Sequence, residues 1–273
     1  MTGDLGLDWI TTFGTGVANE SYGFDMVVEL ADGNIAGCGW MHGSSSGTLP
    51  GFGKQDFYVV KTTKSGQLLD MVCLGTGMQE IPDSAVATPD GGMIMVGSAR
   101  SGSGPSDGLI LILDARLNQV NRITYGGEGE DTFDNIRKLN DGTYIVTGFT
   151  NSQSGNGVGQ SRGGYDFWVM NIDDRGRSIW TRRFGGSADE ELCGTTILED
   201  GSVVLLGSTQ SSDGDVTRGL AAGTGKDAWA VCVSDTGRLL WDFTSGSTAP
   251  DAFSVIPNRS AKSGKYLMKR SPL

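Results

Sequence analysis

Histidine is almost absent from this sequence: His42 is the single histidine among 273 residues. A histidine-based zinc site is therefore excluded, and a Ser-His-Asp triad would have to use His42. That residue lies in a glycine- and serine-rich segment, which positions a general base poorly. A Walker-type glycine loop is also missing, and the GxG strings lack the strand-to-helix context of a nucleotide site. These absences favour a non-catalytic protein.

Long apolar runs and positive charge are scarce as well. No run of about 18 apolar residues occurs, so the sequence predicts no membrane insertion. The formal net charge is −11, which argues against nucleic acid or anionic membranes as partners and favours a cation or a basic partner. No charged and then apolar leader opens the chain, which leaves the compartment open.

The cysteines show no CxxC spacing and lie in apolar, strand-like segments. A thiol in such a segment behaves as a small buried hydrophobe. We therefore expect free, structural thiols at Cys38, Cys73, Cys193 and Cys232.

Glycine, by contrast, is abundant, with 44 glycines against 7 prolines and a charged fraction of 19%. This balance is typical of many tight turns in an all-β protein rather than of a disordered tract. An Asp-Gly turn followed by an apolar run that ends in glycine recurs at spacings of 58, 51 and 59 residues, beginning at Asp32, Asp90, Asp141 and Asp200. An internal repeat of this period indicates a repeat architecture.

Two further landmarks keep the same period. An aromatic residue or leucine precedes glycine at Gly14, Gly75, Gly126 and Gly185, with a weaker copy at Gly246. An aspartate leads an apolar run at Asp56, Asp107, Asp166 and Asp227. Each unit then reads as four short strands bounded by turns, which in the third unit are residues 134–139, 143–149, 166–172 and 178–184.

The predicted fold is a β-propeller of four-stranded antiparallel blades, formed by residues 1–273 as a single domain. Four complete blades occupy residues 22–75, 84–126, 133–185 and 192–246, and a partial fifth occupies 252–273. Residues 8–14 match the last strand of a blade, so we expect this N-terminal strand to close the ring and remove an exposed edge. A fragment of a larger propeller is the alternative.

The units resemble the propeller repeats of roughly 50 to 60 residues found in bacterial surface and secreted proteins. The stretch GGYDFWVMNIDDRGRSIWTRRFGGSADEELCGTTILEDGSVVLLGSTQSSDGD carries the resemblance, which covers about residues 8–256. It implies a non-catalytic protein of the cell exterior or envelope; a cytoplasmic protein is the alternative.

Loop length distinguishes the two sides of such a fold. The connections between the second and third strands are long, at residues 41–55, 99–106, 151–165 and 209–226. They share one side with the connections that enter each new unit, which are acidic. Long loops on a rigid frame usually carry binding, so this acidic side is the predicted binding face. Its candidate ligand-binding residues are Trp40, Phe52, Glu128, Glu130, Asp131, Asp189 and Glu190.

Crowded carboxylates also suggest an oxygen-coordinated Ca²⁺. Asp213 and Asp215, near Asp227, form the best candidate metal site, and a solvated acidic rim is the competing interpretation. The aspartates that lead each third strand are expected to cap that strand's free N–H groups rather than to face a ligand.

Tryptophans recur at equivalent places in the units, which favours packing between blades over a sugar-stacking platform. They are Trp9, Trp180 and Trp241 in the fourth strands, and Trp168 and Trp229 in the third strands with Tyr58 as their counterpart. Trp40 and Phe52 break the period and flank the first long loop, so they are the aromatic candidates for ligand contact.

The function that these features predict is a non-catalytic recognition or scaffold propeller that binds a glycan, a peptide or a protein. Two alternatives stay open: a glycan-processing hydrolase or lyase that uses carboxylates of the acidic side, and a structural spacer or self-assembling unit. The sequence does not determine the oligomeric state.

Overall fold

The computed structural model describes residues 11–13, 21–43, 54–217 and 225–246, together with the backbone of two strands at 251–255 and 268–272. The described residues are all β-strand, turn and loop, without a helix. They divide into two compact units. Unit 1 contains residues 1–104 and 108–124, and unit 2 contains residues 105–107 and 125–273.

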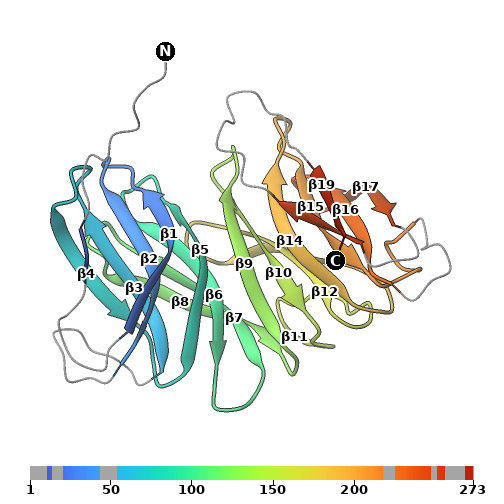
Figure 1. Cartoon of the computed structure of the whole chain (residues 1–273), viewed down its shortest axis with the longest axis horizontal. Helices are drawn as coiled ribbons and strands as arrows, with labels where there is room; N and C mark the ends of the chain where they lie inside the picture. Colours follow the sequence, from blue (N-terminus) through green and yellow to red (C-terminus); the bar gives the residue numbers. More distant parts are fainter. Residues whose placement is uncertain are drawn as a thin grey trace. The chain divides into compact units, whose positions relative to one another are not determined.

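Antiparallel sheets of sequential strands build the fold (Figure 1). The first sheet contains β1 (Ser21–Glu29), β2 (Ile35–His42), β3 (Gln55–Thr62) and β4 (Leu68–Leu74). The second contains β5 (Gln79–Ala87), β6 (Met93–Arg100), β7 (Ser106–Leu113) and β8 (Gln119–Gly127), and the short β11 (Gly155–Asn156) pairs with β8.

The third and fourth sheets lie within unit 2 and repeat the same order. The third contains β9 (Asp131–Lys138), β10 (Tyr144–Thr150), β12 (Asp166–Ile172) and β13 (Ser178–Phe184). The fourth contains β14 (Glu190–Ile197), β15 (Val203–Thr209), β16 (Asp227–Val233) and β17 (Leu239–Ser245). A two-stranded fifth sheet pairs β18 (Asp251–Val255) with β19 (Met268–Pro272).

These strands confirm the prediction of an all-β fold and of four-stranded antiparallel sheets. The two predicted strands 166–172 and 178–184 match β12 and β13 residue for residue, whereas β9 begins three residues before its predicted start. The short β11 was not predicted. Of the expected N-terminal strand 8–14, residues 11–13 are not in a strand, and the remainder lies outside the described residues.

Each glycine that ends the apolar run of a second strand faces a β-bulge in the first strand of its sheet. In the third sheet, a methyl group on Gly148 would overlap the carbonyl oxygen of Thr132. Gly148 pairs with Phe133 on one side and Trp168 on the other, and these two rings stack with centroids 4.3 Å apart because no side chain separates them. The same overlap recurs at Gly39, Gly97 and Gly207.

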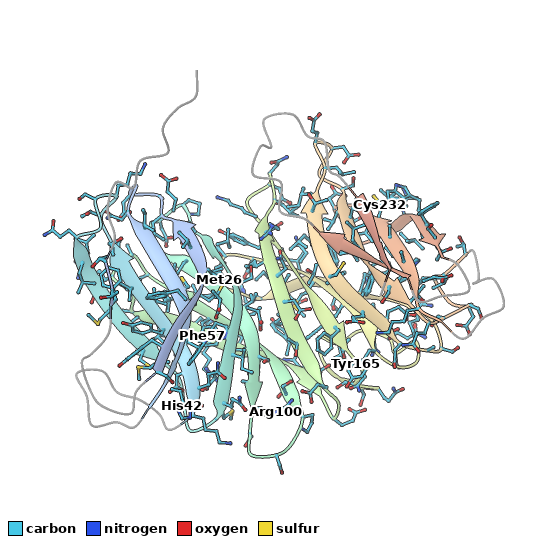
Figure 2. All side chains as sticks on the ribbon, viewed as in Figure 1. Met26, His42, Phe57, Arg100, Tyr165 and Cys232 are labelled. Carbon is cyan, nitrogen blue, oxygen red and sulfur yellow. The ribbon has the colours of Figure 1, made fainter. Side chains whose placement is uncertain are left out.

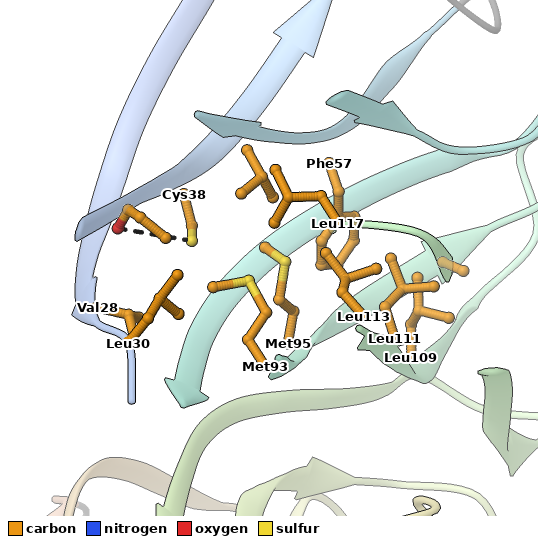
Figure 3. Packing of buried hydrophobic residues seen from close by; sticks show 13 residues of the cluster. Val28, Leu30, Cys38, Phe57, Met93, Met95, Leu109, Leu111, Leu113 and Leu117 are labelled. Carbon is orange, nitrogen blue, oxygen red and sulfur yellow. Dashed lines mark hydrogen bonds between the residues drawn. The ribbon is translucent and has the colours of Figure 1, made fainter. Parts of the chain in front are cut away.

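The core of unit 1 lies between the apolar sides of its sheets (Figure 3). Phe57, Met95 and Leu111 are fully buried there, and the Cys38 thiol points at the carbonyl oxygen of Ala36. Burial raises the pKa of Cys38 to about 12. The four cysteines form no disulfide, as predicted; Cys38, Cys73 and Cys232 are buried, whereas Cys193 is exposed.

Turns between the third and fourth strands place their fourth residue at positive φ. Glycine occupies this position in three sheets, at Gly66, Gly176 and Gly237, and relieves the steric cost of that conformation. The second sheet has Leu117 there instead, with φ of 59°, and its side chain is buried in the unit 1 core. Leu117 shows that core packing offsets a strained backbone at one turn.

Asp25 and Asp83 are the extra residues in the bulges of β1 and β5, both in unit 1. Enclosure by surrounding protein raises the pKa of Asp83 to about 7, and the charge of Asp25 adds to this shift. The Asp83 side chain still reaches water, so its effect on stability is partly screened.

The replacement Asp83→Asn tests whether the pKa of Asp83 is raised, because it changes how the Tm depends on pH. An acid whose pKa is higher in the folded than in the unfolded chain stabilises the fold below its unfolded pKa, and that contribution is lost as pH rises through the folded value. The loss for Asp83 therefore falls between its ordinary pKa of 3.8 and about 7. We expect the Tm difference, variant minus parent, to increase as pH rises across this window. A difference that stays constant with pH would contradict the raised pKa.

Candidate functional site

The loops of unit 2 form one hydrogen-bonded layer, which we call the loop layer and define as residues 128–130, 151–165, 186–189 and 210–217. The Gln153 backbone N–H donates to Glu128 Oε1 (2.9 Å), and the Tyr165 backbone N–H donates to Asp189 Oδ1 (3.0 Å). The Ser187 backbone N–H donates to Asp213 Oδ1 (2.8 Å). These bonds join the long loops to the acidic connections, so the predicted neighbours lie together.

Two of the candidate ligand-binding carboxylates, Asp131 and Glu190, are buried at the starts of β9 and β14 and bond to this layer. Asp131 is fully buried and accepts hydrogen bonds from the Gly127 backbone N–H (2.9 Å), the Ser152 hydroxyl (2.7 Å) and the Thr150 hydroxyl. Asp131 is thus an internal hydrogen-bond acceptor and not an outward carboxylate of the predicted binding face.

Glu190 repeats the arrangement in the fourth sheet. It accepts from the Gly186 backbone N–H (2.9 Å) and the Thr209 hydroxyl (2.6 Å), and it is almost fully buried. Burial raises its pKa, and the nearby charge of Asp166 adds to that rise. In both sheets the carboxylate fastens the end of the second strand to the connection that enters the sheet.

The aspartates that lead each third strand pack against the glycine that ends the fourth strand. A methyl group on Gly185 would overlap the Asp166 carboxylate, and the equivalent overlaps occur between Gly75 and Asp56, Gly126 and Asp107, and Gly246 and Asp227. The recurring aspartates and the recurring glycines of the sequence thus contact each other in the structure. Capping of the strand's first N–H groups, the role expected from the sequence, is replaced at Asp166 by an ion pair.

Asp166 forms that ion pair with Arg183 on β13, and both side chains are fully buried. Arg183 Nε donates to Asp166 Oδ2 (2.9 Å), and the guanidinium also donates to the carbonyl oxygens of Ser152 and Thr150. Burial raises the pKa of Asp166 to about 6, and Arg183 opposes the rise. Asp166 Oδ1 has no hydrogen-bond partner.

The outward side chains of the loop layer are mainly hydrogen-bond acceptors. Glu128 and Asp189 are exposed, and Gln153 is exposed beside them. Tyr165 lies at the edge of the layer, half-buried, with its ring edge-on to Phe149 at a centroid distance of 5.5 Å (Figure 2). Glu130, half-buried, accepts from the Ser106 hydroxyl (2.8 Å).

The predicted calcium ligands do not converge. Asp213 faces the Ser187 backbone N–H, whereas Asp215 accepts from the Gly185 backbone N–H (3.3 Å) and lies 3.3 Å from the Arg162 guanidinium. Asp227 is buried against Gly246. Within the ranges that the structure describes, no three His, Cys, Asp or Glu side chains are grouped to hold a metal. Carboxylates turned toward N–H groups and a guanidinium do not fit a calcium cage.

The aromatic candidates also have specific places. Trp40 lies on β2 with its indole directly over Gly23 of β1, half-buried, and Phe52 lies outside the described residues. Tyr58, Trp168 and Trp229 are fully buried. Trp229 packs against Phe167 of the neighbouring sheet, as predicted, whereas Trp168 stacks on Phe133 of its own sheet. Trp241 is 44% exposed, so its expected packing is not made by the described residues. His42 is the exposed last residue of β2.

Sequence reasoning missed the polar residues that organise the loop layer. Gln153 accepts from the Ser161 hydroxyl (2.9 Å) as well as donating to Glu128, and Arg183 ties the layer to the third sheet. A signal was present: Thr-x-Ser follows β10 and β15, as Thr150 to Ser152 and Thr209 to Ser211. In each, the serine backbone N–H donates to the threonine hydroxyl.

Comparison with known proteins leaves the family open. No family model matches the chain, and no curated protein matches it. Among solved structures, a eukaryotic initiation factor aligns with a TM-score of 0.36 and 11% identity over 81% of this chain and 55% of its own. A mutant of Synechocystis apocarotenoid oxygenase aligns with a TM-score of 0.38 and 12% identity over 84% of this chain and 49% of its own. The chain thus spans about half the length of each.

A search of the described residues for membrane-spanning helices finds none with the required length and apolar character.

Proposed function

We propose that the protein is a non-catalytic recognition or scaffold module that binds a glycan, a peptide or a protein through the loop layer. The observation that carries this proposal is a set of hydrogen bonds between the loops, which join Glu128 to Gln153, Gln153 to Gly163, Tyr165 to Asp189 and Ser187 to Asp213. These bonds fix long loops that contain only the short strand β11, so ligand binding would cost little ordering entropy. Their outward carboxylate and amide oxygens suit a ligand rich in hydroxyl or amine donors.

The propeller architecture is part of the same proposal. Four sheets with the same strand order and the same glycine–aspartate contact support it. Phe13 supports the closing role of the N-terminal segment, because it packs against a buried cluster of the first sheet that contains Tyr58, Val60 and Cys73. Phe184 belongs to the core cluster that also contains Trp229 and Val231 of the fourth sheet. The extracellular or envelope location rests on the repeat resemblance alone.

A glycan array and a basic-peptide array, each probed with the full chain, test the proposal. We expect a ligand whose affinity falls about tenfold when Gln153→Ala and Glu128→Gln are introduced together, because an exposed amide side chain and an exposed negative charge are lost. Gln119→Ala is the control, since Gln119 is exposed on β8 and outside the loop layer. Repeating the titration with Ca²⁺ and with chelator shows whether a cation contributes.

Two results would contradict this function. Equal binding by the paired loop variant would place the site elsewhere on the molecule. Turnover of a bound glycan, lost on changing Glu128 or Asp189 to its amide, would instead indicate a glycan-processing hydrolase or lyase.

A further inference from the structure

Two buried carboxyl groups meet beside Gly185, between the third and fourth sheets of unit 2. A methyl group on Gly185 would overlap both Asp166 Oδ1 and Glu190 Oε2, so these two oxygens face the same small space. The Asp166 side chain is inaccessible to water, and Glu190 is almost fully buried. Because glycine has no side chain to separate them, the two carboxyl groups are close neighbours that water does not screen.

Hydrogen bonds reach all but one of the four carboxyl oxygens. Asp166 Oδ2 accepts from Arg183 Nε (2.9 Å). Glu190 Oε1 accepts from the Thr209 hydroxyl (2.6 Å), and Glu190 Oε2 accepts from the Gly186 backbone N–H (2.9 Å). Asp166 Oδ1 is buried without a hydrogen-bond partner. A buried oxygen without a donor costs free energy, and a proton on that oxygen would remove the cost by making it a donor.

The charges that face Asp166 come from two arginines. Arg183, on β13, is fully buried and bonds directly to the carboxyl group. Arg162 donates its backbone N–H to Asp166 Oδ2 (3.3 Å), whereas its guanidinium lies 3.3 Å from Asp215. Arg183 is therefore the main counter-charge of Asp166, and Arg162 divides its charge between two carboxylates.

Neutral donors face Glu190 from the neighbouring elements. They are the hydroxyls of Thr209 on β15 and of Ser211 in the following loop. A single buried guanidinium thus faces two carboxyl groups. With one proton between them, the two carboxyl groups and Arg183 are neutral together. Without that proton, a net negative charge is left in a site shielded from water, which is costly.

The preceding pair of sheets repeats the arrangement with one difference. A methyl group on Gly126 would overlap Asp107 Oδ1 and meet Asp131 Oδ2. Burial raises the pKa of Asp107, and the charge of Asp131 adds to the rise. Asp107 is only half-buried, so water can relieve the repulsion there. The fully enclosed pair beside Gly185 lacks that relief.

We propose that Asp166 and Glu190 share one proton, held on Asp166 Oδ1 and donated to Glu190 Oε2, and that its loss to water as pH rises loosens the loop layer. A metal ion fits this space less well, because the Gly186 N–H and the Arg183 guanidinium already point at the same carboxyl groups. The proton-sharing pair does not depend on the proposed function.

Both members of the pair fasten the loop layer, which is why it would respond. Arg183, held by Asp166, donates to the carbonyl oxygens of Ser152 and Thr150, at the start of the long loop. Glu190 holds the Gly186 backbone N–H in the next connection. Repulsion between two ionised carboxylates would therefore act on residues 151–165 and 186–189 together.

The direction of the pH effect follows from the pKa values of the two groups. Burial raises the pKa of Asp166 to about 6 against the opposing charge of Arg183, and burial and the charge of Asp166 raise the pKa of Glu190. An acid whose pKa is raised by folding stabilises the fold while it is protonated, and the contribution is lost as pH rises through the folded pKa. We therefore expect a tightly held loop layer below about pH 6 and a looser one above it.

Hydrogen exchange of the full chain, corrected for the intrinsic exchange rate at each pH, tests the proposal. We expect protection of residues 151–165 and 186–189 to fall about tenfold between about pH 5 and about pH 8, because one pKa unit corresponds to a tenfold change in the protonation ratio. Asp166→Asn is expected to keep its protection across this range. Its amide nitrogen can donate to Glu190 Oε2 at every pH, while its oxygen still accepts from Arg183.

Asp174→Asn is the matched control, because Asp174 is an exposed aspartate in a turn of the same sheet. It removes the same charge and is expected to leave the pH dependence of the parent unchanged. Protection that does not change with pH in the parent, or that changes equally in the parent and in Asp166→Asn, would overturn the proposal.

A second measurement uses the parent protein and needs no variant to fold. Carbon NMR of the side-chain carboxyl groups is expected to show Asp166 and Glu190 titrating together, because two groups that share a proton titrate as a pair. In Asp166→Asn, the pKa of Glu190 is expected to fall, since the neighbouring charge is replaced by a donor. Independent titration of the two groups in the parent would refute the shared proton.

Discussion

Replacing Gly148 with alanine is expected to lower the free energy of unfolding by about 3 kcal/mol, because the new methyl group has no room. It would overlap the carbonyl oxygen of Thr132, which the β9–β10 ladder holds in place at the bulge. Backbone on the opposite strand yields less readily than a side chain, and the stacked rings of Phe133 and Trp168 would also have to move. Urea unfolding followed by tryptophan fluorescence measures the change.

Gly77→Ala is the matched control for this substitution. Gly77 has open space where a methyl group would lie, and its φ is not positive. Alanine there is expected to be neutral or to stabilise the fold by about 0.5 kcal/mol through the unfolded chain. If the Gly148→Ala variant is as stable as Gly77→Ala, the bulge can shift to admit a methyl group and the close approach does not require glycine.

Replacing Arg183 with leucine is expected to destabilise the protein by about 3 to 5 kcal/mol, because it leaves a buried carboxylate without its counter-charge. Arg183 and Asp166 are both inaccessible to water, and Arg183 also binds the carbonyl oxygens of Ser152 and Thr150. Loss of the side chain would therefore loosen the loop layer together with the third sheet. Hydrogen exchange across residues 151–165 would show that loosening.

The pH dependence of this effect has a definite sign. In the parent protein the folded pKa of Asp166 is about 6, and the charge of Arg183 keeps it from rising further. In the Arg183→Leu variant we therefore expect a folded pKa above that of the parent. An acid whose pKa is raised by folding stabilises the fold while it is protonated, and that contribution is lost as pH rises through the folded pKa. The penalty of Arg183→Leu is thus expected to grow as pH rises above about 6, the folded pKa of Asp166 in the parent protein.

Arg182→Leu is the control, since Arg182 is exposed on the same strand. The double variant Asp166→Asn and Arg183→Leu is expected to recover part of the loss, because no buried charge remains. A double variant as unstable as Arg183→Leu alone would assign the effect to packing rather than to charge.

The order and type of the strands followed from the sequence because turn chemistry and apolar runs are local signals. Gly176 and Gly237 mark turns that need positive φ, and the runs of β12 and β16 are buried on both sides of their sheets. Bulges are not visible in the same way. Asp134, the extra residue of the β9 bulge, reads as an ordinary strand residue, and the bulge appears only through the partner strand that Gly148 brings close.

The candidate site was predicted less well because exposure of a charged side chain depends on contacts distant in sequence. Asp131 and Asp189 look alike along the chain, yet one is buried by hydroxyls 19 and 21 residues away and the other is exposed. The surroundings of the candidate calcium ligands were hidden for the same reason, because Arg162, 53 residues before Asp215, lies beside that carboxylate. The sequence shows where acidic residues occur, whereas the fold determines which groups their side chains contact.

The turns between the third and fourth strands distinguish one sheet from the others. The second carries Leu117, whose side chain is buried in unit 1, while the fourth carries Gly237 beneath Trp180. If these two turns were exchanged, a leucine at position 237 would overlap the indole of Trp180, and a glycine at position 117 would leave a cavity in the core of unit 1. Neighbouring copies of similar sequence are prone to mispairing during folding and to recombination during evolution. Leu117, at the turn position where the other three sheets have glycine, thus distinguishes the second sheet from its neighbours.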